Sequence, residues 1–481
     1  MEQLKQSTAY AVFKNFEKIS QIPRCSNDEE KISEFIYDFG KRLGLDTKRD
    51  DAGNVLIVKP ASPSFESHDP VILQAHLDMV CEKTEDSLHN FTCDPIDIVI
   101  DGDFIKAKDT TLGADDGAGV ALMMAILEDS KLEHPKLECI FTTTEETGMD
   151  GALALSDQWL TGKNLINLDN EEDWIVIVGC AGGINAYLDL DIKLVENKDL
   201  HNFQIKVSGL RGGHSGSTIG EARLNAIKLL DSLLIKLQNE LSIKLSKIEG
   251  GTKHNAIPSM ANAIIGVEAE NIDSLKEHFE AISLELKDLY LKRELDLEFT
   301  LEEVEKSDNL YIDDEYGKLI LRSLSTFPHG VNSYDKELNI VRSSNNLAKV
   351  RTTKDSFYIE TSIRSSHDQD LEDLKDTVKK QAELYGYKIR FSEGYPMWKP
   401  EFETELLDKA VKIYKSIRNE DMEVLVIHAG LETGILSQKY PDVHMIAIGP
   451  TITGAHTPNE QWSISSTEFT FEYLKTLLKN L

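Results

Sequence analysis

Three short apolar runs, each followed closely by ionisable residues, constrain the fold of this chain more than any other feature. The runs occupy residues 71–75, 137–142 and 165–168. They alternate with stretches of helical character, a pattern typical of a mostly parallel sheet with covering helices. The sequence therefore predicts an α/β fold with a mixed, mostly parallel sheet and helices on both faces.

The ionisable residues that follow these runs are expected to meet. His76 follows the first run, Glu145 and Glu146 the second, and Asp169 the third. A further strand at residues 443–448 leads into a loop that contains His456. In an open α/β sheet, ligands bind outside the carboxyl ends of the strands. We therefore expect these side chains to line one crevice.

Two adjacent acids, Asp115 and Asp116, precede the apolar stretch 120–127 in a glycine-containing loop. Helix capping and the helix dipole favour carboxylates at such a position. The loop is thus predicted to place these acids at the N-terminus of a helix.

The length of the chain and the change in its strand and helix pattern after residue 183 indicate two domains. A chain of 481 residues is too long for one ordinary core. After the glycine-rich residues 179–183, a strand is expected at 203–207 and an amphipathic helix at 221–238, and a second strand and helix follow at 357–363 and 371–384. We predict a metal-binding catalytic domain of residues 1–185 and 392–481, with an inserted α+β lid or dimerisation domain of residues 186–391.

Composition and charge limit the partners and the location. The net charge of −31 repels nucleic acid and anionic membranes. The five cysteines are scattered, so we expect neither a disulfide framework nor a thiolate zinc site, and a reducing compartment. Residues 1–21 carry charges and are predicted to form an amphipathic helix, not a signal peptide. These features predict a cytoplasmic protein.

The chain contains the side chains that a two-metal hydrolytic site needs. Without thiolates, zinc is bound by imidazole and carboxylate, and a metal pair needs about two terminal ligands for each ion and a bridging group. The expected arrangement pairs His76 with Asp169 and Glu146 with His456, and Asp115 bridges them.

Two further acids have roles that follow from their positions. Asp78 is placed to accept the second N–H of His76 and fix its tautomer. Glu145 and Glu146 would repel each other unless a cation neutralises one, which leaves the other free to accept a proton. Each pattern has an ordinary alternative, namely a solvated histidine at a strand end or a solvated acid pair, as expected at residues 50–51, 171–172 and 302–303.

Two glycine-containing motifs give little support to other chemistries. Residues 179–183 lack the G-x-G-x-x-G spacing and the Walker lysine, so a turn or hinge is expected there. Residues 213–217 approach a nucleophile elbow but end in serine where that motif has glycine. A serine hydrolase is therefore poorly supported.

Four passages carry a resemblance to a known family: residues 73–80, 110–117, 144–151 and 448–456. In their order and spacing, the chain resembles the metallopeptidases that include aminoacylase-like and carboxypeptidase-like enzymes. Within that family it most resembles the aminoacyl-histidine dipeptidases, also called cytosol non-specific dipeptidases, over essentially its whole length.

The resemblance implies specific roles. It implies two divalent ions, zinc with cobalt or manganese as alternatives, bound by the five residues His76, Asp115, Glu146, Asp169 and His456. It makes Asp78 the residue that orients His76 and Glu145 the general base. In the inserted domain it implies that His214 stabilises the oxyanion, and that Asn255 and Arg364 hold substrate polar groups, notably a carboxylate. A turn histidine, a turn former and a surface charge are the ordinary alternatives for these three.

The implied activity is hydrolysis of dipeptides that have a free C-terminus, including Xaa-His peptides such as beta-alanyl-histidine. A water bridging the two metals would lose its proton to Glu145 and attack the peptide carbonyl. An N-acyl-amino-acid deacylase with the same site is the main alternative, and a catalytically silent binding protein is disfavoured because no ligand or base is missing. We expect a homodimer, in which His214 acts in its own subunit or in the partner's.

Overall fold

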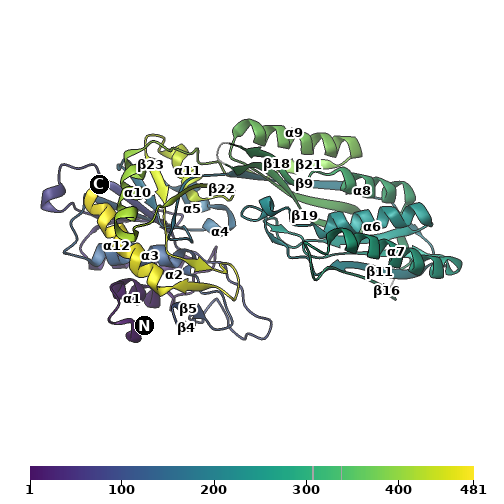
Figure 1. Cartoon of the computed structure of the whole chain (residues 1–481), viewed down its shortest axis with the longest axis horizontal. Helices are drawn as coiled ribbons and strands as arrows, with labels where there is room; N and C mark the ends of the chain where they lie inside the picture. The colour runs from purple at the N-terminus through teal and green to yellow at the C-terminus, as the bar shows by residue number, and fades with distance from the viewer. Residues whose placement is uncertain (306–307, 337–338) are drawn as a thin grey trace. The chain divides into compact units, whose positions relative to one another are not determined.

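The computed structural model describes residues 1–305, 308–336 and 339–481, and it divides into two compact units (Figure 1). Unit 1 comprises residues 1–180, 398–426 and 431–481, and unit 2 comprises residues 181–397 and 427–430. The chain passes from one unit to the other within the glycine-rich stretch that was expected to be a turn or hinge. The insertion predicted at residues 186–391 falls inside unit 2, and its role as a lid stays a prediction.

Unit 1 is built on an eight-stranded mixed sheet. Parallel pairing joins β6 to β3, β3 to β7 and β7 to β23 at the centre, and antiparallel strands lie beside them. In spatial order the strands are β1 (Asp46–Arg49), β2 (Val55–Lys59), β6 (Leu137–Thr142), β3 (Val71–His76), β7 (Asn164–Asn167), β23 (His444–Ala447), β8 (Ile175–Cys180) and β22 (Glu423–Ile427).

The burial of the strands shows that both faces of this sheet are covered. Every residue of β3, β6 and β8 is buried, and strands covered on both faces read as continuous apolar runs. The helices of the unit are α1 (Tyr10–Ile19), α2 (Glu30–Arg42), α3 (Ala114–Glu128), α4 (Glu145–Gly148), α5 (Asp150–Ala154), α10 (Glu405–Arg418), α11 (Glu432–Lys439) and α12 (Ile464–Asn480). The predicted fold class of this unit is confirmed.

Helix α3 is apolar around its whole circumference because it lies inside unit 1. It packs against α1 and against β3, and nearly all of its side chains are buried. A smaller four-stranded sheet, in the order β24 (Ile452–Thr453), β25 (Gln461–Ser463), β5 (Phe104–Ala107) and β4 (Ile98–Asp101), completes this unit.

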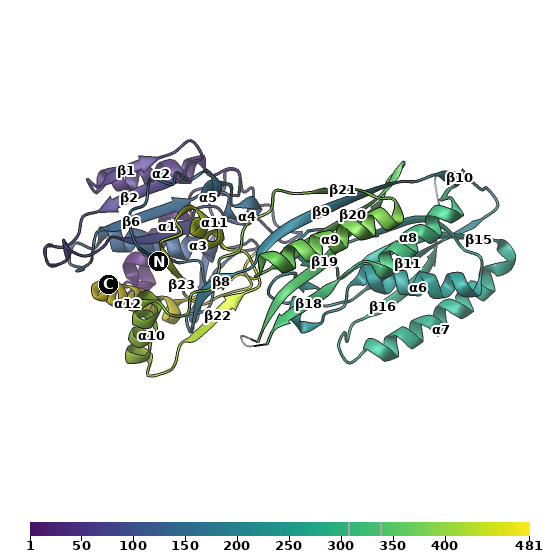
Figure 2. The same ribbon diagram turned by 90° about the horizontal axis from the view of Figure 1, so that it is seen from above.

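Unit 2 is built on a largely antiparallel sheet with helices over one face (Figure 2). Its strands alternate buried and less buried residues, as in β11, which indicates a single covered face. The strands run β16 (Glu298–Glu303), β11 (His201–Ser208), β15 (Ala261–Val267), β13 (Lys244–Gly250), β19 (Ile340–Thr352), β20 (Ser356–Ser365), β9 (Gly182–Asp191) and β21 (Lys388–Phe391), and β18 (Gly330–Asp335) pairs with β19.

Four helices supply the apolar side chains that pack on this sheet, namely α6 (Ala226–Glu240), α7 (Ile272–Tyr290), α8 (Asp314–Thr326) and α9 (Asp368–Tyr385). Two short strand pairs stand apart from the sheet: β10 (Leu194–Glu196) with β17 (Leu310–Ile312), and β12 (Gly213–His214) with β14 (Ala256–Ile257). The strands expected at residues 203–207 and 357–363 lie within β11 and β20. The predicted α+β character of this part is confirmed.

Two expectations about local structure are wrong. The helix expected from residue 221 begins at Ala226, because the Asn225 side chain caps it by accepting hydrogen bonds from the backbone of Ile227 and Lys228. The cysteines are not all unpaired: Cys25 and Cys81 form a disulfide. These two cysteines are 56 residues apart, and they meet because the segment at Cys25 pairs with the chain at Met79.

Within the residues that the structure describes, none of the helices combines the length and the apolar character that a membrane span requires.

Candidate active site

The parallel strands of unit 1 bring the predicted ligands to one edge of the sheet. His76 is the last residue of β3, and Asp169 follows the neighbouring strand β7. On the other side of β3, strand β6 leads into α4, which begins with Glu145 and Glu146. Because these strands run parallel, their carboxyl ends meet at the same edge.

The five predicted metal ligands form a cluster, in which Asp115 lies between His76 and His456. Its Oδ1 is 3.2 Å from Nε2 of His76, and its Oδ2 is 3.0 Å from Nε2 of His456. Each carboxylate oxygen therefore faces one imidazole, which is the geometry that a bridging carboxylate requires.

The remaining contacts divide the cluster into two pairs. Asp169 Oδ1 is 3.6 Å from Nε2 of His76, and Glu146 Oε1 is 2.8 Å from Nε2 of His456. Among the residues that the structure describes, three sets of side chains each have candidate ligand atoms within 4.8 Å of one another. These sets are His76 with Asp116 and Asp169, His76 with Glu145 and Glu146, and Asp115 with Glu146 and His456. The structure thus brings all five predicted ligands together, and their metal binding stays a prediction.

Asp78 connects His76 to the start of α4. Its Oδ1 lies 3.3 Å from Nδ1 of His76 and accepts a hydrogen bond of 2.9 Å from the backbone N–H of Glu145. Its Oδ2 accepts hydrogen bonds from the N–H of Glu146 at 3.2 Å and from the Ser26 hydroxyl at 2.8 Å. One fully buried carboxylate therefore fixes both the imidazole and the two glutamates.

Burial raises the pKa values of three acids in and beside the cluster. It raises the pKa of Asp169 to about 6 and that of Glu146 to about 7, and it raises the pKa of Glu145 well above its ordinary value. Burial lowers the pKa of His456, but hydrogen bonds to Asp115 and Glu146 outweigh this effect and raise it to about 12. Carboxyl groups that resist ionisation beside two imidazoles suit a site for divalent cations.

Sequence reasoning missed several acids at this edge. Asp116 groups with His76 and Asp169, and its Oδ2 accepts a hydrogen bond of 3.2 Å from the N–H of His76. Glu432, in α11, accepts hydrogen bonds from Gln74 at 2.6 Å and from Thr142 at 2.5 Å, and burial raises its pKa to about 8.

Glu171 is the other missed acid, because its adjacent pair was expected to be solvated. The residue is only partly exposed, and burial raises the pKa of its carboxyl group to about 8. Repulsion from Asp115 and Asp169 acts in the same direction. A pair of adjacent acids gives no sequence signal that distinguishes this environment from a solvated one.

Unit 2 holds His214, Asn255 and Arg364 in one region. His214 lies in β12, which pairs with β14, and the N–H of Ser215 donates to the carbonyl oxygen of Asn255 at 2.7 Å. The His214 ring is itself oriented, because its Nδ1 accepts from the N–H groups of Gly216 and Ser217 at 3.3 Å each.

Arg364 is buried in β20 beside two polar residues that the sequence did not reveal. Its Nη1 donates to the Tyr395 hydroxyl at 2.5 Å, and Ser344 is its partner in the neighbouring strand β19. The Ser344 hydroxyl is 2.7 Å from Nε2 of His428. A Cβ atom on Gly216 would lie 2.8 Å from the His428 carbonyl oxygen, so the His214 loop packs closely against this group.

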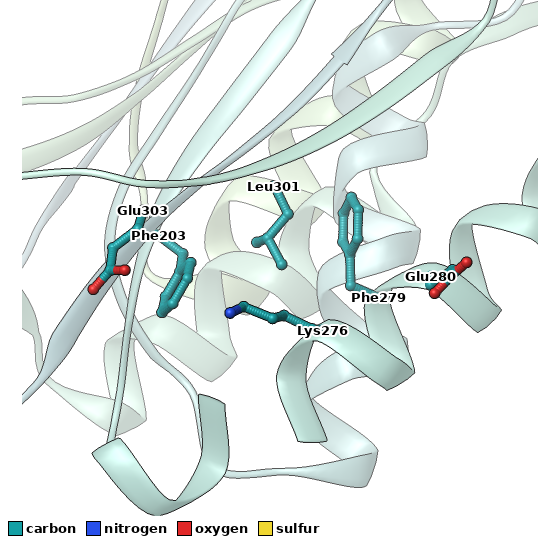
Figure 3. Close-up of a pocket in the computed structure, with 6 residues that line it drawn as sticks. All are labelled: Phe203, Lys276, Phe279, Glu280, Leu301 and Glu303. Carbon is teal, nitrogen blue, oxygen red and sulfur yellow. The ribbon is translucent and has the colours of Figure 1, made fainter. Parts of the chain in front are cut away.

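A separate pocket in unit 2 has different chemistry (Figure 3). It has a volume of about 400 Å³ and lies between α7 and strands β11 and β16. Its lining residues are Phe203, Lys276, Phe279, Glu280, Leu301 and Glu303. Because none of the predicted site residues belongs to this lining, the chemistry is not placed here.

Imidazoles and carboxylates gathered at the carboxyl ends of parallel strands suit a metal-dependent hydrolase. The chain belongs to peptidase family M20/M25/M40, whose model matches residues 72–480. This confirms the family resemblance of its motifs.

The chain is similar to individual members of this family over its full length. It is 38% identical to the cytosol non-specific dipeptidase of Escherichia coli, covering 100% of this chain and 99% of that protein. It is 35% identical to the solved aminoacylhistidine dipeptidase from Vibrio alginolyticus, with a TM-score of 0.81 and coverage of 100% and 99%. A tripeptidase from Staphylococcus aureus shares the fold at 15% identity, with a TM-score of 0.57 and coverage of 98% of both chains.

The stability of the metal-free protein should fall as the pH rises. The ordinary pKa values of Asp169 and Glu146 are 3.8 and 4.5, and their values in the folded chain are about 6 and about 7. Between these limits the folded chain keeps protons that the unfolded chain has lost, so ionisation favours unfolding. The raised pKa of His456 acts in the same direction, because its stabilisation is lost as the pH rises.

Urea unfolding of metal-stripped protein should therefore give a free energy of unfolding lower at about pH 8 than at about pH 5, by on the order of 2 kcal/mol. Added Zn²⁺ should restore stability at the higher pH, because bound cations offset the repulsion. A free energy that rises with pH in metal-free protein, or that Zn²⁺ leaves unchanged, would contradict this account.

Proposed function

We propose that this protein is a metal-dependent dipeptidase that hydrolyses dipeptides with a free C-terminus. The observation that carries the proposal is the position of Asp115, one oxygen facing His76 and the other facing His456. The relatives support it, since the similar proteins from Escherichia coli and Vibrio alginolyticus are named as dipeptidases. The name of the first also supports a cytoplasmic location, and that of the second supports Xaa-His substrates, such as beta-alanyl-histidine.

The donor set suits two divalent ions. We assign His76 and Asp169 to one ion, Glu146 and His456 to the other, and Asp115 to both. Zinc fits nitrogen and carboxylate ligands well, and cobalt and manganese are the alternatives. When bound, such ions supply Lewis-acid polarisation of the scissile carbonyl and activation of water.

Glu145 is assigned as the general base. Its backbone is held by Asp78, so its side chain starts from a fixed point at the first residue of α4. Burial raises its pKa, and the charge of Glu146 raises it further, which makes the Glu145 carboxylate a stronger proton acceptor. In the proposed reaction, Glu145 takes the proton of the attacking water and later delivers it to the leaving amine.

Substrate recognition is assigned to three polar residues of unit 2, namely His214, Asn255 and Arg364. His214 is proposed to stabilise the oxyanion, and Asn255 to hold a substrate polar group. Arg364 suits a substrate carboxylate because a guanidinium presents paired N–H donors. The Tyr395 hydroxyl accepts a hydrogen bond from Nη1 of Arg364 and limits the orientations of that guanidinium.

A panel of substrates tests the proposal against its main alternative. An N-acyl-amino-acid deacylase would share the same metal ligands. We expect protein reconstituted separately with zinc, manganese and cobalt to cleave dipeptides, Xaa-His peptides among them, much faster than N-acyl amino acids. Faster cleavage of the acyl amino acids would favour the deacylase, and metal binding without either activity would favour a binding protein.

The Glu145→Gln variant should bind both metals but lose roughly a hundredfold or more in kcat, because an amide cannot accept the proton. Elemental analysis and steady-state kinetics measure the two effects. Asp150→Asn provides a control, since Asp150 is an exposed acid at the start of the next helix, α5. Turnover of Glu145→Gln equal to that of the control would remove Glu145 from the mechanism.

The Arg364→Lys variant should raise KM for dipeptides roughly tenfold or more, because an ammonium does not reproduce the paired contact with a carboxylate. Dipeptides whose C-terminus is amidated should show little further loss. Arg342→Lys is the matched control, because Arg342 lies two residues before Ser344 in β19 but its guanidinium pairs with Asp370 at 2.8 Å and is not assigned to substrate binding. An equal loss with free and amidated substrates would mean that Arg364 does not bind the carboxylate.

A further inference from the structure

The carboxylate of Glu460 binds four consecutive backbone amides at the start of α3. Its Oε2 accepts hydrogen bonds from Leu112 at 2.7 Å and Gly113 at 2.9 Å. Its Oε1 accepts from Ala114 at 2.7 Å and Asp115 at 3.3 Å. Glu460 is 2% exposed, so these bonds are shielded from water. Hydrogen bonds to a charged acceptor are stronger than neutral ones, and burial strengthens them further.

The contact joins the two loops that carry Asp115 and His456. Glu460 lies four residues after His456, in the loop between β24 and β25. Two backbone hydrogen bonds stabilise this loop. The N–H of Thr457 donates to the carbonyl oxygen of Gly454 at 3.2 Å, and the N–H of Glu460 donates to that of Thr457 at 3.1 Å. A displacement of the Glu460 carboxylate would therefore change the position of Asp115 relative to His456.

A buried arginine holds the opposite side of the Asp115 loop. Arg24 donates through Nη2 to the carbonyl oxygen of Gly113 and through Nη1 to those of Leu77 and Asp78, at 2.9 and 3.0 Å. Gly113 is thus held by its N–H and by its C=O. It has a φ of +71°, and a Cβ there would lie 2.6 Å from Nη2 of Arg24, so only glycine fits this position well.

We propose that Glu460 is a positioning residue for the metal site, because it holds the backbone at Asp115 where the side chain faces both His76 and His456. The inference rests on the metal site of the proposed function. Glu460 is not itself assigned as a ligand, since both of its oxygens are occupied by amide donors. Its charge at the N-terminus of α3 also suits the positive end of the helix dipole.

The Glu460→Gln variant replaces one acceptor oxygen by an NH₂ group, which would face N–H donors. The backbone at Asp115 should then lose hydrogen bonds that hold it in place. The affinity for divalent metal should fall roughly tenfold or more, the range for partners that orient ligands. Calorimetric titration of metal-stripped protein with Zn²⁺, with a competing chelator, measures the effect directly. In the reconstituted enzyme, kcat should fall while KM for a dipeptide changes little.

Glu138 supplies a matched control in the same unit. It is 1% exposed and accepts from the N–H groups of Thr161 at 2.6 Å and Gly162 at 3.0 Å, and from the Thr161 hydroxyl at 2.5 Å. It is therefore also a buried carboxylate that binds backbone amides, but it lies in β6 away from the cluster. Glu138→Gln should destabilise the protein to urea and leave Zn²⁺ affinity unchanged.

The Glu460→Asp variant keeps the charge and should retain an affinity between those of the wild type and Glu460→Gln. It also replaces Glu460→Gln if that variant does not fold. The inference is overturned if the folded Gln variant, or the Asp variant in its place, binds Zn²⁺ like the wild type or loses no more affinity than Glu138→Gln. Wild-type protein that binds Zn²⁺ but cleaves no dipeptide would overturn the proposed function alone.

Discussion

Repulsion among buried carboxylates at the edge of the unit 1 sheet is the constraint on which the surrounding structure depends. Burial raises the pKa values of Glu146, Asp169 and Glu432, and repulsion from neighbouring acids raises them further, so each of these groups resists ionisation in the folded chain. The two imidazoles supply limited positive charge. Divalent cations would compensate this repulsion if these donors bind them, as proposed, and their binding would then stabilise the folded chain.

Backbone amides at the starts of helices supply a further part of the compensation. The first amides of α4 donate to Asp78, and the amides at the start of α3 donate to Glu460. Within α3, Asp116 accepts from the N–H of Gly119 at 3.0 Å. These N–H donors bind Asp78, Glu460 and Asp116, which surround the predicted ligands. The carboxylate oxygens of Asp115 and Glu146 therefore stay available to bind metal.

The sequence predicted the residues whose positions depend on local pattern. A residue at the end of an apolar run is at the end of a strand, and parallel strands end together, so His76, Glu146 and Asp169 were recognised as neighbours. The sequence predicted a bridging role for Asp115 but not the contact of Asp116 with His76, because adjacent acids in a loop look alike until the backbone directs each side chain. It also missed the start of α6, since an apolar period does not mark the residue that caps a helix.

Contacts between distant segments left no comparable signal. Glu460 and Ala114 are 346 positions apart, and the acceptors of Arg24 are backbone carbonyls, which any residue supplies. The pairing of Cys25 with Cys81 depends in the same way on which segments meet. Family resemblance supplied roles for His214, Asn255 and Arg364, but it did not reveal the contacts of Arg364 in unit 2.

Arg24 shows why a buried cation beside this cluster need not compete with metal. Burial lowers its pKa, while Glu460, Asp78, Asp116 and Asp115 raise it, so its charge acts on the whole group of acids. Its Nη1 and Nη2 groups nevertheless donate to carbonyl oxygens, at Leu77, Asp78 and Gly113. A guanidinium that bound Asp115 directly would occupy the oxygens that face the two histidines. Because Arg24 binds the backbone, its positive charge stabilises the neighbouring carboxylates without occupying the ligand oxygens.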